Sequence, residues 1–231
     1  MKALPNSVLT DDVLARIAAP IENGSALPNA CYISDEWLQS ENERIFSTQW
    51  MLAGFCHDIP EPGDACPVKV AGMPLLLLRD GNHEVVVFHN VCLHRGAVIL
   101  DESCKGQKAL ICPYHAWTYG LDGKLRGRPH FYGGGKHDLE PDDDIPGLSR
   151  VRHAVWHDLI FVDLSGKAVS FEEHWVPFSR RMEAYDFSAL RYAKTLDFDI
   201  KGNWKLVYEN FFDPYHVPRV HPRLDKYTPM S

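Results

Sequence analysis

Two short cysteine and histidine motifs between residues 92 and 117 constrain the fold of this chain more than any other feature. The first reads Cys-Leu-His-Arg-Gly at residues 92–96, and the second reads Cys-Pro-Tyr-His-Ala-Trp at residues 112–117. Each motif offers one thiolate and one imidazole from a tight loop. Together they supply two sulfur and two nitrogen donors, which is a complete ligand set if the fold brings the loops together.

Two kinds of metal centre use such a set. A single zinc ion accepts two cysteines and two histidines, but zinc fingers usually take the cysteine pair from one element and the histidine pair from another. A Rieske [2Fe-2S] cluster binds both histidines on one iron and both thiolates on the other. Mixed pairs suit the cluster, because each loop then reaches both irons. From the spacing alone, both centres remain open.

Charge and hydropathy exclude several classes of partner. The 231 residues carry a formal net charge of −7 and have a pI of about 5.9, which argues against nucleic acid or an anionic membrane as a partner. The longest apolar run, Leu75–Leu78, is far too short to span a bilayer. The first residues lack the apolar segment of a signal peptide, so we expect a cytoplasmic protein. The cysteines outside the two motifs are irregularly spaced, and we expect free thiols rather than a disulfide framework.

The pattern along the chain predicts an α+β protein in three parts. Residues 1–45 are predicted to form an N-terminal arm with a helix capped by Ser34, whose apolar stripe would pack on the following sheet. Residues 46–165 contain short apolar runs separated by turn signals, which is typical of an all-β sandwich. The two cysteine-histidine loops would be hairpin loops at one end of that sandwich. An Asp-Gly pair at residues 122–123 predicts a further hairpin turn.

Residues 166–231 are predicted to begin a second domain. Ser170 and Glu173 have the spacing of a capping box, which predicts a helix that continues to Tyr185. Apolar and polar residues then alternate from residue 196 to residue 201, which predicts a half-buried strand.

A second candidate metal site lies on a predicted helix from Asn203 to Tyr215. One face of this helix is aromatic, and the opposite face would carry Glu209, Asp213 and His216. His221 follows Pro218, where a break in the helix would let it lie beside His216. Two histidines next to a carboxylate suggest the facial triad of a non-haem ferrous iron site.

The two loop motifs and the segment at residues 203–222 resemble the large (α) subunits of Rieske non-haem iron oxygenases, which hydroxylate aromatic rings or demethylate their substrates. The resemblance covers roughly residues 40–223. The family more often has Gly where Ala116 stands and commonly has Pro where Leu93 stands. Respiratory Rieske proteins instead carry an extra cysteine in each loop and a Ser at the position of Trp117, and neither feature is present here.

This resemblance implies a role for each motif residue. The [2Fe-2S] cluster would be bound by Cys92, His94, Cys112 and His115. The mononuclear Fe(II) would be bound by His216 and His221. Asp213 would be the catalytic carboxylate that bridges a Rieske histidine of one subunit and an iron histidine of another.

The resemblance also implies cofactors, partners and an assembly. Electrons would come from NAD(P)H through a ferredoxin or flavin reductase, and O₂ would react with a small organic substrate. A head-to-tail homotrimer, possibly with a β subunit, would place each cluster beside the iron of a neighbour. The catalytic domain of the family has a helix-grip type of α+β fold.

The third iron ligand of the family is a carboxylate on a much later helix, and only ten residues follow His221. Asp225 and Glu209 are the local substitutes, although neither matches the family pattern. We therefore expect the chain to lack the C-terminal part of the catalytic domain. The alternative is a Rieske electron-transfer protein without oxygenase activity. The Asp-Pro-Tyr-His sequence at residues 213–216 also occurs in members that act on aromatic acids and on quaternary amines.

Overall fold

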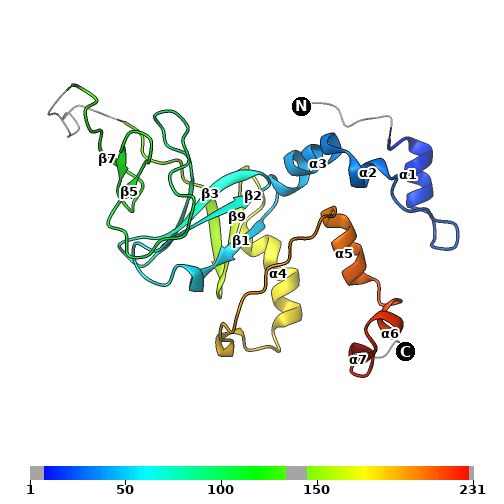
Figure 1. Ribbon diagram of the computed structural model, residues 1–231. Coiled ribbons are helices and arrows are strands. Elements are labelled where there is room, and N and C mark those ends of the chain that lie inside the picture. The colour runs from blue at the N-terminus through cyan, green and yellow to red at the C-terminus, as the bar shows by residue number, and fades with distance from the viewer. Residues whose placement is uncertain (1–7, 134–144, 229–231) are drawn as a thin grey trace. The chain divides into compact units, whose positions relative to one another are not determined.

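The computed structural model describes residues 8–133 and 145–228 (Figure 1). Contacts between residues divide the chain into two compact units. One unit comprises residues 42–193 and contains all the strands of the described residues. The other comprises residues 1–41 together with residues 194–231 and is helical. None of the described helices has the length and apolar character needed to cross a membrane.

The strands of residues 42–193 form three antiparallel sheets of three strands each. Sheet A has the order β1 (Met51–Phe55), β9 (Leu159–Asp163) and β8 (Arg152–Trp156). Sheet B has the order β2 (Ala65–Val70), β3 (Met73–Arg79) and β4 (Val85–His89). Sheet C has the order β5 (Leu110–Ile111), β6 (Thr118–Tyr119) and β7 (Leu125–Gly127).

Sheet B is buried on both faces, and this explains the unbroken run of four leucines at residues 75–78. Successive side chains of a strand point to opposite faces. Leu76 packs with Tyr119 of sheet C, whereas Leu77 packs with Ile160 of sheet A, and all four leucines are fully buried. Figure 1 shows sheet B between the other two sheets. Burial of each leucine contributes about 2 kcal/mol, so this strand is a main source of stability. The predicted all-β sandwich is confirmed.

The predicted hairpin turn at residues 122–123 joins β6 to β7. Gly123 has a φ of +83°, and a Cβ at this position would lie 2.4 Å from the ring of Phe88. Its N–H donates to the carbonyl of Gly120. Only glycine combines this backbone conformation with so close an approach, so the turn is fixed by the sequence.

Helix α4 (Phe171–Met182) follows sheet A. The Ser170 hydroxyl accepts a hydrogen bond from the Glu173 N–H at 3.1 Å, so the predicted cap is confirmed. The helix ends at Met182, three residues before the predicted end at Tyr185. Phe171 packs against Trp50 and Phe161, with ring centroids 5.3 and 5.1 Å away. A π-helical turn at Asn42–Phe46 and two 3-10 turns at Cys56–Asp58 and Phe187–Ala189 complete this unit.

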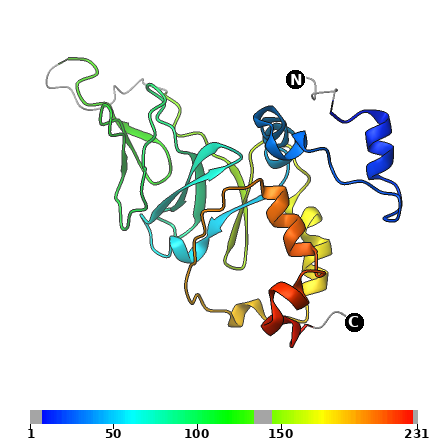
Figure 2. The same ribbon diagram turned by 45° about the vertical axis from the view of Figure 1, so that its right-hand side comes forward.

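The described residues of the helical unit form six short helices. They are α1 (Asp11–Ile17), α2 (Ala30–Ile33), α3 (Asp35–Glu41), α5 (Trp204–Phe212), α6 (Val217–Val220) and α7 (Pro222–Asp225). Figure 2 shows the last three as successive segments joined by short turns. The Ser34 hydroxyl accepts from the N–H of Trp37 at 3.1 Å, which confirms the predicted start of α3.

Two expectations for this unit are wrong. The predicted apolar stripe after Ser34 is only partly buried, because Leu38 and Ile45 are exposed and the buried end of α3, at Glu41, joins α5. The predicted strand at residues 196–201 is an extended segment without strand pairing to any described residue. Its apolar side chains are exposed, with Phe198 at 77%. Alternation alone does not form a strand when no neighbouring edge pairs with it.

Candidate metal centres

The two cysteine-histidine loops have the same backbone hydrogen bonds. The N–H of Cys92 donates to the carbonyl of Ala97, and the N–H of Cys112 donates to the carbonyl of Trp117, at 2.8 and 2.9 Å. In each loop the residue four positions after the cysteine donates back to the cysteine carbonyl at 3.0 Å. That residue has a positive φ in both loops, +71° at Gly96 and +55° at Ala116. The two motifs therefore fold into two copies of one turn.

The structure brings the four predicted donors together as a thiol pair and an imidazole pair. Cys92 and Cys112 are each 2% exposed, and the Cys92 thiol contacts that of Cys112. The rings of His94 and His115 lie nearer the surface, with their centroids 4.6 Å apart. The sulfur donors thus lie inside and the nitrogen donors outside.

The protonation of these side chains follows from their surroundings. Burial, with a further contribution from the neighbouring Cys92 thiol, raises the pKa of Cys112. Burial, followed by the charges of His115 and Arg95, lowers the pKa of His94. A neutral imidazole is the form that binds a metal, whereas the thiols must lose their protons to do so.

This arrangement fits a two-iron cluster. Within residues 8–133 and 145–228, no three histidine, cysteine, aspartate or glutamate side chains converge as ligands of one metal ion. The donors instead come in two pairs of like atoms, buried sulfur and outward nitrogen. A [2Fe-2S] cluster with one iron bound by thiolates and one by imidazoles needs this separation. A tetrahedral zinc ion would need all four donors at one point.

Asn90 and Tyr119 were not identified from the sequence, and the contact made by the motif residue Trp117 was not predicted. The amide of Asn90 accepts from the backbone of Ile99 and Leu100 and donates to the Leu100 carbonyl, which closes the first loop. The Tyr119 hydroxyl lies 3.2 Å from the Cys92 Sγ, and burial raises the pKa of this tyrosine. Trp117 stacks on the ring of His94 at 4.9 Å with an interplanar angle of 6°. The spacing of the donors in the sequence gives no signal for these contacts, which arise from folding.

The second candidate site lies after helix α5. Asn203 caps this helix through its side chain, which accepts from the N–H of Lys205 at 3.0 Å. The helix ends at Phe212, and Asp213 leaves it in an extended conformation. The predicted face of Glu209, Asp213 and His216 is therefore not formed on one continuous helix.

His216 and His221 lie side by side because they flank the single helical turn of α6. Their ring centroids are 5.3 Å apart. The predicted break beyond Pro218 is present at His221, and the chain breaks once more before His216, because Pro218 lies in the first turn of the short helix α6. The histidines still meet, as predicted.

Asp213 is directed at the first of these histidines. Its Oδ2 lies 3.6 Å from the Nδ1 of His216, which is buried and has no hydrogen-bond partner among the described residues. Its Oδ1 accepts from the N–H of Tyr215 at 2.8 Å, which fixes the carboxylate. Two imidazoles and a nearby carboxylate are the groups of a non-haem iron site in which a carboxylate orients a histidine ligand.

His216 and His221 would provide two of the three donors of a facial triad. Glu209, one local substitute for the third ligand, accepts a hydrogen bond from the hydroxyl of Tyr32 at 2.7 Å. This bond raises the pKa of Tyr32 to about 12. Asp225, the other substitute, ends α7 and does not complete a three-donor group within the described part of the chain.

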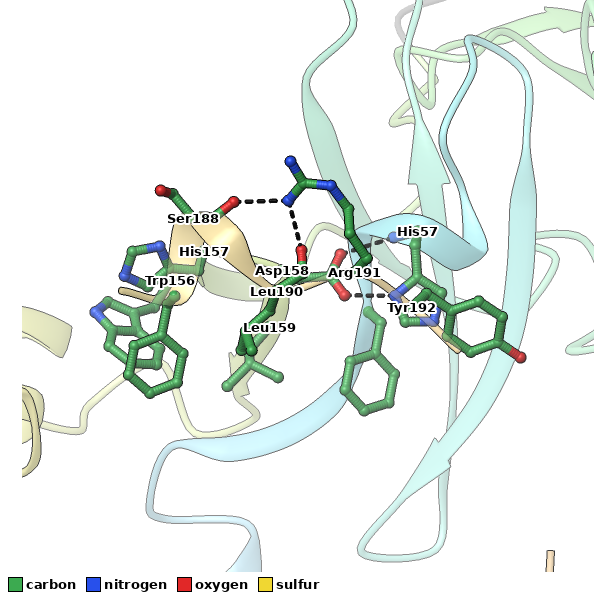
Figure 3. Close-up of a pocket in the computed structure, with 11 residues that line it drawn as sticks. His57, Trp156, His157, Asp158, Leu159, Ser188, Leu190, Arg191 and Tyr192 are labelled. Carbon is green, nitrogen blue, oxygen red and sulfur yellow. Dashed lines mark hydrogen bonds and ion pairs between the residues drawn. The ribbon is translucent and has the colours of Figure 1, made fainter. Parts of the chain in front are cut away.

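A pocket of about 590 Å³ in the unit of residues 42–193 contains none of the predicted site residues (Figure 3). The imidazole of His57 bonds to the carboxylate of Asp158 on one wall, between the rings of Phe55 and Tyr192. The opposite wall includes Trp156. This pocket was not predicted from the sequence, because its aromatic rings come from segments about a hundred residues apart.

Comparisons with known proteins match both candidate sites. The Rieske [2Fe-2S] domain family matches residues 49–133, and the catalytic-domain family of the ring-hydroxylating α subunit matches residues 187–231. The glycine betaine monooxygenase oxygenase subunit of Pseudomonas aeruginosa is 32% identical over 89% of this chain and 47% of its own length. The large oxygenase component of salicylate 5-hydroxylase from a Ralstonia species is also 32% identical, over 87% of this chain and 50% of its own.

A solved structure gives the same result for the fold. The quaternary ammonium Rieske monooxygenase CntA is similar to this chain with a TM-score of 0.74 and 25% identity. The similarity covers 86% of this chain and 55% of that protein. The chain spans about half the length of the curated relatives that it matches.

Proposed function

The chain belongs to the Rieske non-haem iron oxygenases and is of the large (α) subunit type, and from this premise we propose that it is part of an oxygenase. The proposed reaction is hydroxylation or oxidative demethylation of a small organic substrate by O₂. When bound, the [2Fe-2S] cluster supplies one-electron transfer and the mononuclear iron supplies activation of O₂.

The single observation that carries this proposal is the pairing of donors in the two loops. We propose that Cys92 and Cys112 hold the inner iron of the cluster and that His94 and His115 hold the outer one. Their positions support this assignment, because the thiols are buried and the imidazoles lie toward the surface. An outward imidazole pair gives electrons a short route to and from a partner protein.

For the second site, we propose that His216 and His221 bind the mononuclear iron. Asp213 would accept a hydrogen bond from the Nδ1 of His216 and so hold that ring with its Nε2 toward the metal. The distance of 3.6 Å between Asp213 and this ring supports the role. In the assembled trimer, the same carboxylate would also accept from a cluster histidine of a neighbouring subunit.

We further propose a quaternary ammonium compound as the substrate class. The matched relatives include a glycine betaine monooxygenase and a quaternary ammonium monooxygenase, and this favours a quaternary amine over an aromatic acid. The salicylate 5-hydroxylase component makes aromatic acids the second choice.

The proposed partners follow the family. A ferredoxin or flavin reductase would deliver electrons from NAD(P)H, and three copies of the subunit would assemble head to tail, with or without a β subunit. The domain limits of 1–45, 46–165 and 166–231 and the cytoplasmic location remain predictions.

Metal analysis of the anaerobically purified protein tests the cluster. We expect two acid-labile sulfides per chain and a coloured protein, whereas a zinc protein would be colourless. Cys112→Ser should abolish the sulfide and the colour, and Cys66→Ser, at a partly buried cysteine outside the motifs, should leave both unchanged.

Oxygen uptake separates the oxygenase from the second candidate function, a Rieske electron carrier. With a reductase and NAD(P)H, glycine betaine or choline should stimulate O₂ consumption with formation of a demethylated or hydroxylated product. A chain that is reduced and reoxidised with no substrate-dependent uptake would support the carrier instead.

A further inference from the structure

The helix that leads into the second candidate site is anchored by a buried ion pair. The Nζ of Lys205 lies 2.6 Å from the Oε1 of Glu41, and the two side chains are each 8% exposed. Lys205 is the only buried residue of α5, whereas Glu41 ends α3. A buried charge is costly unless it is paired and hydrogen-bonded, so this pair holds the two helices together only in one geometry.

Two indole groups complete the hydrogen bonds of this glutamate. The Nε1 of Trp37 donates to Oε1 at 3.0 Å, and the Nε1 of Trp204 donates to Oε2 at 2.9 Å. Both carboxylate oxygens therefore accept from α5, one from Lys205 and one from Trp204. We call these four residues, Trp37, Glu41, Trp204 and Lys205, the Glu41 clamp.

A second contact fixes the rotation of α5 about its axis. The side chain of Asn203 donates to the carbonyl of Tyr32 at 3.1 Å, and the hydroxyl of Tyr32 donates to Glu209 at 2.7 Å. Residues 203 and 209 are almost two helical turns apart, so Tyr32 contacts the start and the later half of the helix. The cation of Lys205 also lies 5.5 Å from the centroid of the Tyr32 ring.

The remainder of α5 has no comparable anchor among the described residues. Its aromatic residues are exposed, including Phe211 at 83% and Phe212 at 62%. Asp213 follows directly, and its N–H donates to the carbonyl of Glu209, so its position depends on the orientation of the helix. His216 lies only three residues further on.

We propose that Glu41 is a positioning residue for the mononuclear iron site: through Lys205 and Trp204 it sets the orientation of α5 and thereby places Asp213 and His216. This inference rests on the proposed function, because it assumes that His216 and His221 bind metal. It assigns a role to the N-terminal helices, which contribute none of the proposed ligands.

Titration with Co(II) tests the role, because cobalt reports on the second site independently of the iron in the cluster. The full chain with its cluster is used, and bound Co(II) is followed by its visible absorption and by its loss in His216→Ala. We expect Glu41→Gln to weaken Co(II) binding at least tenfold, which is the usual effect of losing a residue that orients a metal ligand. Gln has almost the same volume as Glu, but its amide nitrogen is a donor. It would face one of the N–H donors of the clamp, so one hydrogen bond of residue 41 would be lost.

Lys201→Met provides the matched control. Lys201 pairs with Asp199 just before α5, but both side chains are exposed, at 85% and 79%. We expect its Co(II) affinity to stay within twofold of the unsubstituted protein. If Glu41→Gln bound Co(II) with the same affinity as the unsubstituted protein, the proposed role of Glu41 would be refuted.

The double variant Glu41→Gln with Lys205→Met separates positioning from general stability, because it removes the unpaired buried cation that the single variant leaves. We expect its melting temperature to recover while Co(II) binding stays weak. If the Co(II) affinity of the double variant recovered together with its melting temperature, the Glu41 clamp would only stabilise the fold. That result would contradict the inference.

The unsubstituted protein distinguishes this failure from failure of the proposed function. If it binds no Co(II) through His216, the mononuclear site and the inference fall together. If it binds Co(II) normally but Glu41→Gln does so equally well, only the role of Glu41 is refuted.

Discussion

Ala116 has a backbone conformation that favours glycine. Its φ of +55° corresponds to that of Gly96 in the equivalent position of the first loop. An L-residue in this region costs about 1–2 kcal/mol, which explains why glycine is the commoner residue in the second loop of the family. The alanine is retained here because the surrounding loop hydrogen bonds fix the turn.

We therefore expect Ala116→Gly to stabilise the protein. Relief of the left-handed conformation exceeds the entropy that glycine adds to the unfolded chain, so the free energy of unfolding should rise by about 0.5–1 kcal/mol. Urea unfolding measures the change. Ala97→Gly, in the first loop but without a positive φ, should instead destabilise, and a loss of stability in both variants would contradict this explanation.

Tyr119 is expected to tune the cluster. Its hydroxyl, 3.2 Å from the Cys92 Sγ, would donate to the bound thiolate and stabilise the more negative, reduced cluster. Tyr119→Phe should lower the reduction potential by roughly 45 mV, which corresponds to one hydrogen bond of about 1 kcal/mol for a one-electron couple. Protein-film voltammetry measures the potential. Tyr114→Phe, at an exposed ring in the second loop, is the control, and an equal shift in both variants would refute the assignment.

At the scale of single residues, the sequence predicts the metal-binding side chains but not the residues that contact and position them. Cysteine and histidine are few and have a characteristic spacing at metal sites, so the four loop donors, His216 and His221 could be predicted without a structure. Asn90 and Tyr119 are ordinary strand-end and strand residues in the sequence. Their roles appear only when folding brings them to the loops.

The turn between β6 and β7 makes a prediction at the level of elements. Gly123→Ala would suffer both a positive φ and a contact of 2.4 Å with the Phe88 ring, whereas Gly72→Ala would suffer only the positive φ, with no atom within 4 Å. We expect losses of about 3–5 kcal/mol for Gly123→Ala and about 1 kcal/mol for Gly72→Ala. Thermal or urea unfolding compares the two, and equal losses would show that the contact with Phe88 is relieved without cost.

Asp163 joins the end of β9 to the segment before α4. Burial by itself raises the pKa of this 1% exposed carboxyl, but hydrogen bonds from Ser165, Arg152 and the backbone N–H groups of Ala168 and Gly166 hold it below the ordinary value. A depressed folded pKa gives stability that is complete above the unfolded pKa of about 3.9 and is lost as pH falls through the folded pKa.

Asp163→Asn should therefore lower the free energy of unfolding at pH 7 by about 2–3 kcal/mol and should reduce its decline on acidification. Urea unfolding between pH 7 and pH 3 measures both effects. Asp199→Asn, at an exposed carboxylate, should follow the unsubstituted protein. Parallel pH curves for Asp163→Asn and the unsubstituted protein would contradict the account.

The strands of sheets A and B and the starts of α3 and α4 could be predicted because their signals are local. Alternation, turn residues and caps act over a few residues. The segment at residues 196–201 has the same alternation but no strand to pair with among the described residues. The end of α5 at Phe212 likewise depends on the extended backbone of Asp213, which the helical spacing of the aromatic residues does not indicate.

At the scale of the whole molecule, the unit formed by the first 41 residues and the last 38 was not predicted from the sequence. Its central bond joins Glu41 and Lys205, which lie 164 positions apart. Lys205 lies in the segment at residues 203–222 that resembles the iron segment of the family, but Glu41 belongs to none of the recognised motifs. Contacts of such sequence separation arise from tertiary packing, for which composition and periodicity give no signal.

Nitrogen electron-nuclear double resonance on the reduced, anaerobically purified protein tests the central claim most directly. We predict a [2Fe-2S] cluster in which one iron is coupled to two histidine nitrogens, with loss of one coupling or of the whole cluster in His94→Ala and in His115→Ala. A metal centre without sulfide, or a cluster with no histidine nitrogen bound to iron, would contradict the account.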